Sequence, residues 1–293
     1  MIYCAQQFTL ISRYLVALRR VLFICAGENT VLTKHRLESY LSKGRNGSLI
    51  FLDTVASTNT LATQLARRGT ADGTAVIANC QTKGSGRLGR SFYSPGDIGV
   101  YFSYVKVLPE DGACSVGLLT SLAALAVCGA IDSVCHFEPR VKWPNDILVG
   151  GKKVCGILTN LITDTAINRV SHAVIGIGIN VNHNPEDFPE ELAEKAGSLK
   201  MFVGQPVSRE RLCAETLNEL DRLLIDEGAL LRDPVPYVDR LTALSCTIGN
   251  MVRISTPKGP ETVLALGLTS DGGLIVDNLV ERKVVRFGEV ETI

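Results

Sequence analysis

A long stretch without a charged residue, Ala113–Ile131, sets the strongest constraint on how this chain folds. A helix that is apolar on every side has to be enclosed, either by lipid or by a protein core. Strand-like segments flank this stretch, and small or polar residues dilute its hydrophobicity, namely Ser115, Gly117, Thr120, Ser121 and Gly129. The sequence therefore predicts a helix buried inside a folded protein and not a membrane span.

A second apolar stretch, Phe8–Gly27, is interrupted by Arg13, Arg19 and Arg20. Its longest uninterrupted apolar run, Val21–Ala26, is too short to cross a membrane. The stretch also lacks the order of charge, apolar core and cleavage site that defines a signal peptide. Two interpretations stay open: an amphipathic helix, or sequence translated from an upstream start codon. Neither predicts an association with a membrane.

Composition and charge exclude several classes of protein. The chain is 46% hydrophobic and 20% charged, which is ordinary for a folded protein, and its formal net charge is +0. Proteins that coat nucleic acid are normally basic, so this balance argues against that class. The nine cysteines form no C-x-x-C pair, and the four histidines do not lie near them at the spacing of metal ligands. We therefore expect no disulfide framework and no protein-bound metal, and free thiols indicate a cytoplasmic protein.

The order of expected elements divides the chain into three regions. Residues 1–47 form an N-terminal extension. Residues 48–240 combine helices with a mixed or mostly antiparallel sheet, with strands expected at 48–53, 74–80, 100–107, 154–162 and 172–181. After Pro234 and Pro236 the pattern changes to short strands separated by turns. Strands of this length and spacing predict a small β-barrel over residues 245–293.

One loop, Gln81–Phe92, concentrates glycines and cations. Glycines let backbone N–H groups approach an anion closely, and arginine offers a planar fork to phosphate oxygens. The loop lacks the G-K-[ST] ending of a Walker loop. Two interpretations remain from composition alone: a loop that closes on a nucleotide phosphate, or a solvated basic surface loop.

Two further segments carry residues suited to chemistry. Arg140–Asp146 places Lys142, the only tryptophan, a proline, an amide and a carboxylate beside apolar strand residues. A lysine at the end of a strand can neutralise charge on an acyl phosphate, although a lone lysine is more often a surface residue. The segment from Gly176 to Asn180 has glycines at alternate strand positions. Such glycines mark close approach of a ligand or of another backbone.

Together with Ser57-Thr58-Asn59, these segments resemble the biotin protein ligase family. Its marks are an S-T-N segment, a G-R-G-R-x-G-R-x-W loop, a K-W-P-N-D strand and a G-x-G-x-N strand. The resemblance runs from about Ser48 to the C-terminus. It implies an α+β catalytic domain like that of class II synthetases, with flanking helices, and a C-terminal SH3-like barrel. Two positions depart from the pattern, because Ser85 replaces a loop arginine and Phe92 replaces the loop tryptophan.

The resemblance also implies roles for individual residues. The biotin site would comprise Ser57, Thr58, Asn59, Gln81, Gly84, Gly86, Arg87, Lys142 and Gly156. The ATP and adenylate site would comprise Arg87, Arg90, Phe92, Lys142, Gly176, Gly178 and Asn180. Arg87 and Lys142 would be the catalytic pair, and Lys153 would join Gly156 on the opposite wall.

The implied reaction consumes biotin and Mg-ATP, forms biotinyl-5′-AMP and transfers biotin to a lysine. The acceptor would be a biotin carboxyl carrier protein or domain of a carboxylase such as acetyl-CoA carboxylase, and the enzyme would be a monomer or a homodimer. Two alternatives stay open: a lipoate or octanoate ligase, and a biotin-sensing transcriptional repressor. Repressors of this family carry an N-terminal winged helix, and the residues before Ser48 show no helix-turn-helix pattern. We therefore expect the short form of the family, without sequence-specific DNA binding.

Overall fold

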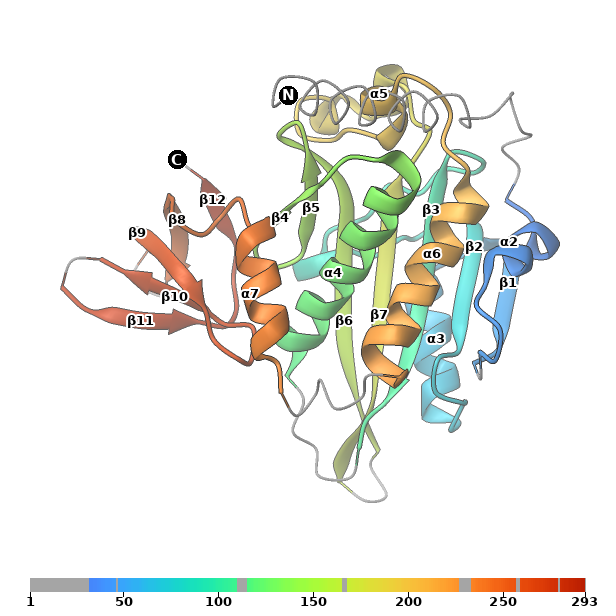
Figure 1. Ribbon diagram of the computed structural model, residues 1–293, viewed down its shortest axis with the longest axis horizontal. Helices are drawn as coiled ribbons and strands as arrows, with labels where there is room; N and C mark the ends of the chain where they lie inside the picture. Colours follow the sequence, from blue (N-terminus) through green and yellow to red (C-terminus); the bar gives the residue numbers. More distant parts are fainter. Residues whose placement is uncertain are drawn as a thin grey trace, which may run out of the picture. The chain divides into compact units, whose positions relative to one another are not determined.

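A computed structural model gives the fold (Figure 1). The residues it describes are 32–45, 47–109, 115–164, 168–226, 233–256, 259–278 and 280–292. The apolar stretch Phe8–Gly27 lies outside these residues. The described chain forms a seven-stranded sheet with helices, followed by a five-stranded antiparallel sheet.

The seven-stranded sheet has the order β1-β2-β3-β7-β6-β5-β4. Its strands are β1 (Leu49–Val55), β2 (Ala75–Gln81), β3 (Gly99–Val107), β4 (Arg140–Lys142), β5 (Asp146–Val149), β6 (Lys152–Asp164) and β7 (Arg169–Asn180). The pair β1–β2 is parallel and all other neighbours are antiparallel. This mixed sheet confirms the predicted α+β class. The tight turn at Gly150-Gly151, where both residues have positive φ, joins β5 to β6 as a hairpin.

Helices cover both faces of this sheet. The helices are α2 (Lys34–Tyr40), α3 (Thr58–Arg67), α4 (Val116–Cys135), α5 (Leu199–Val203), α6 (Arg209–Asp221) and α7 (Val235–Leu244). Short helical turns are η1 (Arg87–Gly89), η2 (Pro185–Asp187), η3 (Glu190–Leu192) and the π-helical η4 (Arg222–Asp226). Successive strand residues point to opposite faces, so Ile77 packs in the core formed with α4 and α6 while Val76 packs against α3.

The uncharged stretch forms α4, as predicted. Ser115 caps its first turn by accepting a hydrogen bond from the Leu118 N–H at 3.0 Å. This is a helix long and apolar enough to cross a membrane, and 72% of its most apolar part is buried inside the protein. The main sheet and α6 therefore enclose α4 in the way that lipid would enclose a membrane helix.

The main core begins before residue 48. Leu37 of α2 is fully buried, and the Asn218 side chain of α6 donates to the Tyr40 carbonyl at 3.0 Å. Part of the region expected to be an N-terminal extension therefore packs on α6. The domain boundaries proposed from the sequence otherwise stay predictions.

The C-terminal sheet has the order β11-β10-β9-β8-β12 and a separate apolar core. Its strands are β8 (Met251–Thr256), β9 (Gly259–Leu268), β10 (Leu274–Asp277), β11 (Arg282–Val285) and β12 (Val290–Thr292). We call it the C-terminal barrel. Trp143 of the main domain packs in its core, and the indole N–H donates to the Gly272 carbonyl at 3.0 Å. The tryptophan of the K-W-P-N-D segment therefore fixes the barrel to the main sheet.

Candidate active site

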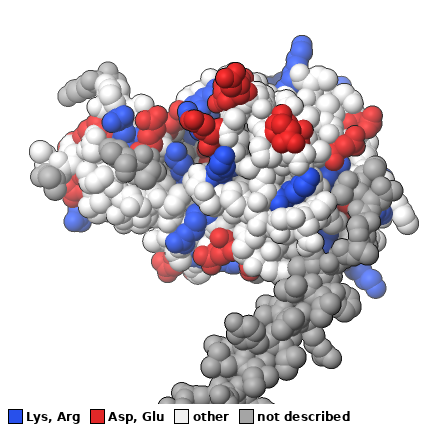
Figure 2. All heavy atoms as spheres, turned by 90° about the horizontal axis from the view of Figure 1, so that it is seen from above, with Lys and Arg blue, Asp and Glu red and all other residues white. Residues whose placement is uncertain are grey.

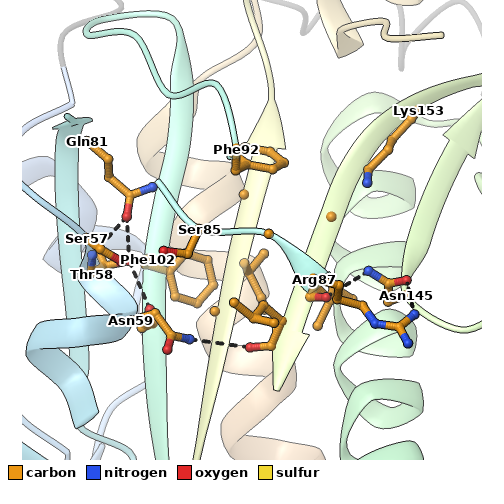
Figure 3. A pocket seen from close by; sticks show the side chains of 18 residues that line it. Ser57, Thr58, Asn59, Gln81, Ser85, Arg87, Phe92, Phe102, Asn145 and Lys153 are labelled. Carbon is orange, nitrogen blue, oxygen red and sulfur yellow. Dashed lines mark hydrogen bonds between the residues drawn. The ribbon is translucent and has the colours of Figure 1, made fainter. Parts of the chain in front are cut away.

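Two adjoining cavities lie beside the ends of α3, β2, β6 and β7. The inner cavity is lined by residues of the S-T-N segment, the glycine-rich loop and the facing strands (Figure 3). The outer cavity continues from it toward Tyr93, Asn180 and Phe188. Five residues line both cavities: Gly86, Arg87, Phe92, Asn145 and Lys153. Two ligands placed in these cavities would therefore meet at these five residues.

The far end of the inner cavity is polar. Ser57 caps α3, which turns the backbone so that Thr58 and Asn59 face inward. The Thr58 N–H donates to the Gln81 side-chain carbonyl at 2.8 Å, and the Thr58 hydroxyl lies 2.9 Å from that of Ser103. These buried groups retain unused donors and acceptors, so they suit an uncharged head that both donates and accepts hydrogen bonds.

A floor of glycines makes the middle of the inner cavity flat. Gly156 on β6 pairs with Gly178 on β7, and Gly176 lies two residues earlier. A Cβ added at Gly178 would come within 2.4 Å of the Phe92 ring, and one added at Gly176 within 2.8 Å of the Asn59 amide nitrogen. Any side chain at Gly176 or Gly178 would therefore fill the middle of the inner cavity.

The glycine-rich loop folds back on itself over the floor. The Gly86 N–H donates to the Arg90 carbonyl at 2.7 Å, and the Phe92 N–H donates to the Gly84 carbonyl at 2.8 Å. Gly84 does not line either cavity. A Cβ there would lie 2.4 Å from the Phe92 carbonyl oxygen, so its role is to let the loop pass close to itself.

The two loop arginines have partners outside the loop. The Arg87 guanidinium donates to the Asn145 side-chain oxygen and to the Gly288 carbonyl, both at 3.1 Å. Burial lowers the pKa of Arg87, while Asp146 opposes this shift. Arg90 forms an ion pair with Glu289. Because Gly288 and Glu289 belong to the C-terminal barrel, that barrel holds the cationic side of the site, a contact that no sequence pattern predicted.

Of the lysines considered, Lys153 and not Lys142 reaches the cavities. Lys153 lines both, and its Nζ lies 2.6 Å from Asp146 Oδ1. Lys142 borders neither cavity, because β4 is the last strand of the sheet and lies beyond β5 and β6. The catalytic role expected for Lys142 therefore lacks geometric support. Two other residues of the same segment, Asn145 and Asp146, reach the site although no role was assigned to them.

The remaining expected residues take places in or near the outer cavity. Asn180 is buried at the end of β7, where its amide donates to the Lys153 carbonyl at 3.4 Å. Arg90 and Phe92 line the same space. Phe188 and Tyr93 add aromatic surface that the sequence patterns did not reveal. Within the described part of the chain, no three His, Cys, Asp or Glu side chains are grouped to hold a metal ion.

A buried histidine supports the aromatic wall of the outer cavity. The His183 ring stacks on Phe188 with centroids 4.9 Å apart and planes 9° apart. The side chain is fully buried, and neither ring nitrogen has a hydrogen-bond partner among the described residues. Burial lowers the pKa of His183 to about 4, with Asp187 opposing the shift.

Because the pKa of His183 is lowered, we expect the folded protein to lose stability in mild acid. In the unfolded chain its pKa is about 6.5, so between pH 6.5 and 4 the unfolded state takes up a proton that the folded state does not. The free energy of unfolding should fall across that window, by up to about 3 kcal/mol from this residue. Urea unfolding of the wild type and of His183→Phe at several pH values measures it. Parallel pH dependences for the two proteins would contradict the assignment.

Comparisons with known proteins find similar sequences and a similar fold. Residues 51–180 match the model of the Biotin/lipoate A/B protein ligase family. The chain is 34% identical over 243 residues to the bifunctional ligase/repressor BirA of Bacillus subtilis, covering 83% of this chain and 73% of the relative. It is 31% identical to the biotin–[acetyl-CoA-carboxylase] ligase of Mycobacterium tuberculosis, covering 82% and 88%. The biotin protein ligase from Aquifex aeolicus in complex with biotin and ATP superposes with a TM-score of 0.70 at 27% identity, covering 84% and 98%.

Proposed function

This chain belongs to the biotin protein ligase family, and we propose that it activates biotin with ATP and transfers it to a lysine of a biotin carboxyl carrier domain. The main support for this proposal is that Arg87 and Lys153 line both the inner and the outer cavity. Two anions that react with each other repel, and a shared cationic wall is what such a reaction needs.

Biotin fits the inner cavity by its shape and polarity. Its ureido head both donates and accepts hydrogen bonds, which suits the polar end at Thr58, Asn59 and Gln81. Its fused rings would lie on the glycine floor formed by Gly156, Gly176 and Gly178. The carboxylate at the end of its chain would then reach Arg87 and Lys153. This orientation presents the reactive group to the outer cavity.

ATP fits the outer cavity by its charge and its aromatic base. The adenine would stack on aromatic rings and reach the amide of Asn180. The phosphates would lie between Arg87, Arg90 and Lys153. Because the described residues supply no cluster of metal ligands, we expect Mg²⁺ to arrive as the ion of the Mg-ATP substrate.

The proposed mechanism has two steps. An oxygen of the biotin carboxylate attacks the α-phosphorus of ATP, the bond to the β-phosphate oxygen breaks, and pyrophosphate leaves. Arg87 and Lys153 neutralise both reactants, and Asp146 holds the Lys153 ammonium in place. An amine of the acceptor then attacks the acyl carbon, and AMP leaves. The loop over the site would keep water from the mixed anhydride.

The alternatives are disfavoured by particular features. The dithiolane of lipoate has no hydrogen-bond donor for the polar end of the inner cavity, so buried polar groups there would lose their partners. A repressor needs a surface for DNA. On the face seen in Figure 2, basic and acidic side chains are interspersed and do not form one basic patch. We therefore propose a ligase without sequence-specific DNA binding. The free cysteines of the described chain support a cytoplasmic location, and we propose a monomer or a homodimer.

The test of this function is transfer of labelled biotin. The protein is incubated with Mg-ATP, biotin and a biotin carboxyl carrier domain, with lipoate as a competitor. We expect label on the carrier lysine, release of one pyrophosphate per biotin and no inhibition by equimolar lipoate. Transfer of lipoate without transfer of biotin would overturn the assignment of the substrate.

We expect a substitution in the glycine-rich loop, Arg87→Gly, to release biotinyl-AMP from the site. Arg87 is the loop cation with direct bonds both to Asn145 and to the barrel. Its loss in Arg87→Gly should weaken retention of biotinyl-AMP by about tenfold or more, since hydrogen bonds to a charged group contribute about 1.5–3 kcal/mol. The variant should then label lysines of unrelated proteins nearby. Rapid gel filtration of the complex with radiolabelled adenylate measures retention, with Arg67→Gly on α3 as the control.

A further inference from the structure

A third cavity lies where the main sheet meets the C-terminal barrel. We call it the junction cavity. Its walls come from the start of α4 (Val116, Thr120), from β6 (Thr159) and from the barrel segment Arg286-Phe287. Nothing in the proposed binding of biotin or ATP uses these residues.

The junction cavity adjoins the inner cavity. The two share Arg87, Asn145, Ile157 and Leu158 as lining residues, and the outer cavity also reaches Arg87 and Asn145. Three cavities therefore converge on one arginine and one amide. The proposed reaction also needs three groups at one point: a carboxylate, an α-phosphate and an amine.

Resting on the proposed function, we propose that the junction cavity admits the side chain of the acceptor lysine to the acyl carbon of biotinyl-AMP. In this arrangement the lysine nitrogen bonds to the acyl carbon, the bond from that carbon to the phosphate oxygen breaks, and AMP leaves with the electron pair. The nitrogen releases its proton to water. The amine approaches from the barrel side, while the adenylate fills the other two cavities.

The walls suit a lysine side chain. Val116, Trp143 and Leu158 offer apolar surface to its methylene groups, and the hydroxyls of Thr120 and Thr159, 2.8 Å apart, lie beside them. Both charged side chains that line the cavity, Arg87 and Arg286, are cations.

This charge pattern favours the reactive form of the amine. Neighbouring cations and partial burial both disfavour an ammonium ion, so the lysine would lose its proton more readily and attack as a neutral amine. Asp271 lies behind the lining, where it pairs with Arg286 at 2.7 Å and reduces part of this effect. Arg87 has no carboxylate bonded to it in the described chain, but the phosphate of the adenylate would offset its charge, so Arg286 is the cation whose removal tests this effect.

The mouth of the cavity suits a folded protein. Phe287 is 78% exposed, although it is a large apolar residue. Exposed aromatic residues are enriched in protein interfaces, where their burial contributes much of the affinity. The domain that carries the acceptor lysine would cover Phe287 as the lysine enters.

Filling the cavity provides the first test. Two variants place a larger side chain in the cavity: Thr120→Leu from the buried wall and Val116→Phe from the half-buried rim. In both, pyrophosphate release with biotin and ATP should stay within about twofold of the wild-type rate. Single-turnover transfer from the enzyme–adenylate complex should fall by about tenfold or more, both to the carrier domain and to n-butylamine, since a misplaced nucleophile loses this much rate or more. Unchanged transfer to both amines in variants that still form adenylate would overturn the proposal. If the wild-type protein released no pyrophosphate with biotin and ATP, the proposed function itself would be overturned.

The rim provides the second test. Phe287→Ala should raise the KM for the carrier domain by about five- to tenfold and leave transfer to n-butylamine unchanged. Arg286→Gln should move the pH profile of transfer toward higher pH, because the lysine loses a neighbouring cation. Arg282→Gln is the matched control, since Arg282 forms a similar exposed ion pair with Asp277 on the barrel. Equal pH profiles for the Arg286 and Arg282 variants, together with an unchanged KM in Phe287→Ala, would exclude this mouth as the docking point.

Discussion

Replacing Lys153 with alanine should slow the formation of biotinyl-AMP by about a hundredfold or more. Lys153 is the lysine that lines both the inner and the outer cavity, and Asp146 holds its ammonium at 2.6 Å. A preorganised cation at the point where charge moves between two anions typically contributes about 3–4 kcal/mol to the transition state. Its removal should lower kcat for pyrophosphate release more than it raises the KM for biotin.

Lys142→Ala is the matched control for that experiment. Lys142 lies on β4, only a few residues from Asp146, but it borders neither cavity. Its removal should change pyrophosphate release by less than about threefold, because this half-buried side chain reaches neither cavity. A hundredfold loss in Lys142→Ala with a near-normal Lys153→Ala would reverse the assignment. Lys153→Arg tests the geometry further, because the wider guanidinium should not restore full activity.

The two lysines illustrate a limit of predicting a site from sequence patterns. K-W-P-N-D predicted that its strand contributes to the site, and Asn145 and Asp146 do so. Which lysine reaches the cavities depends on the order β7-β6-β5-β4, and that order places Lys153 on β6 two strands closer to β7 than Lys142 on β4. A pattern of residue types carries no information on strand order. The resemblance placed Lys153 on the opposite wall, but the residues alone could not rank it above Lys142.

Local motifs carried more information on the geometry of the glycines and of the polar end. The resemblance assigned Gly176 and Gly178 to the ATP and adenylate site, but both line the inner cavity and neither lines the outer one. Gly176 and Gly178 alternate along a strand, so their bare surfaces have to face the same side. Ser57 precedes the first helical turn, which fixes where Thr58 and Asn59 point. In both cases the relevant geometry spans only a few residues, and local backbone rules determine it.

Contacts between distant segments could not be predicted. Arg87 bonds to the carbonyl of Gly288, which lies 201 residues further along the chain. The partner is a backbone oxygen, so no residue type marks it. A different limit applies to β12, a strand of three residues, because it has too few positions to show the alternation that predicts a strand.

The second large expected effect concerns Trp143, a residue of the K-W-P-N-D segment to which the resemblance assigned no role. Its side chain is 6% exposed and packs in the apolar core of the C-terminal barrel, with Val252, Leu274 and Val290. Its backbone N–H donates to the Thr247 hydroxyl and its indole N–H to the Gly272 carbonyl, each at 3.0 Å. Trp143 of the main domain therefore completes the core of the C-terminal barrel.

Trp143→Ala should lower the free energy of unfolding by about 3–5 kcal/mol, the usual cost of truncating a buried large aromatic. Adenylate formation should fall with it, because the barrel turn that holds Arg87 and Arg90 would no longer be fixed. Trp143→Phe keeps most of the apolar contact but leaves the Gly272 carbonyl without a donor, so its cost should be about 1–3 kcal/mol. Thermal unfolding and pyrophosphate release measure both variants.

The chain provides an internal reporter for the same contact. Trp143 is its only tryptophan, so the intrinsic fluorescence excited at the indole band reports on this interface. In the wild type, the emission should move to longer wavelength in urea together with the loss of adenylate formation. Phe287→Ala is the control, since this aromatic is on the barrel but 78% exposed, and its removal should leave the urea midpoint unchanged. If Trp143→Ala unfolds at the wild-type temperature and still forms adenylate at the wild-type rate, the barrel is held in place by other contacts, such as that of Ser115 with the Asp271 carbonyl.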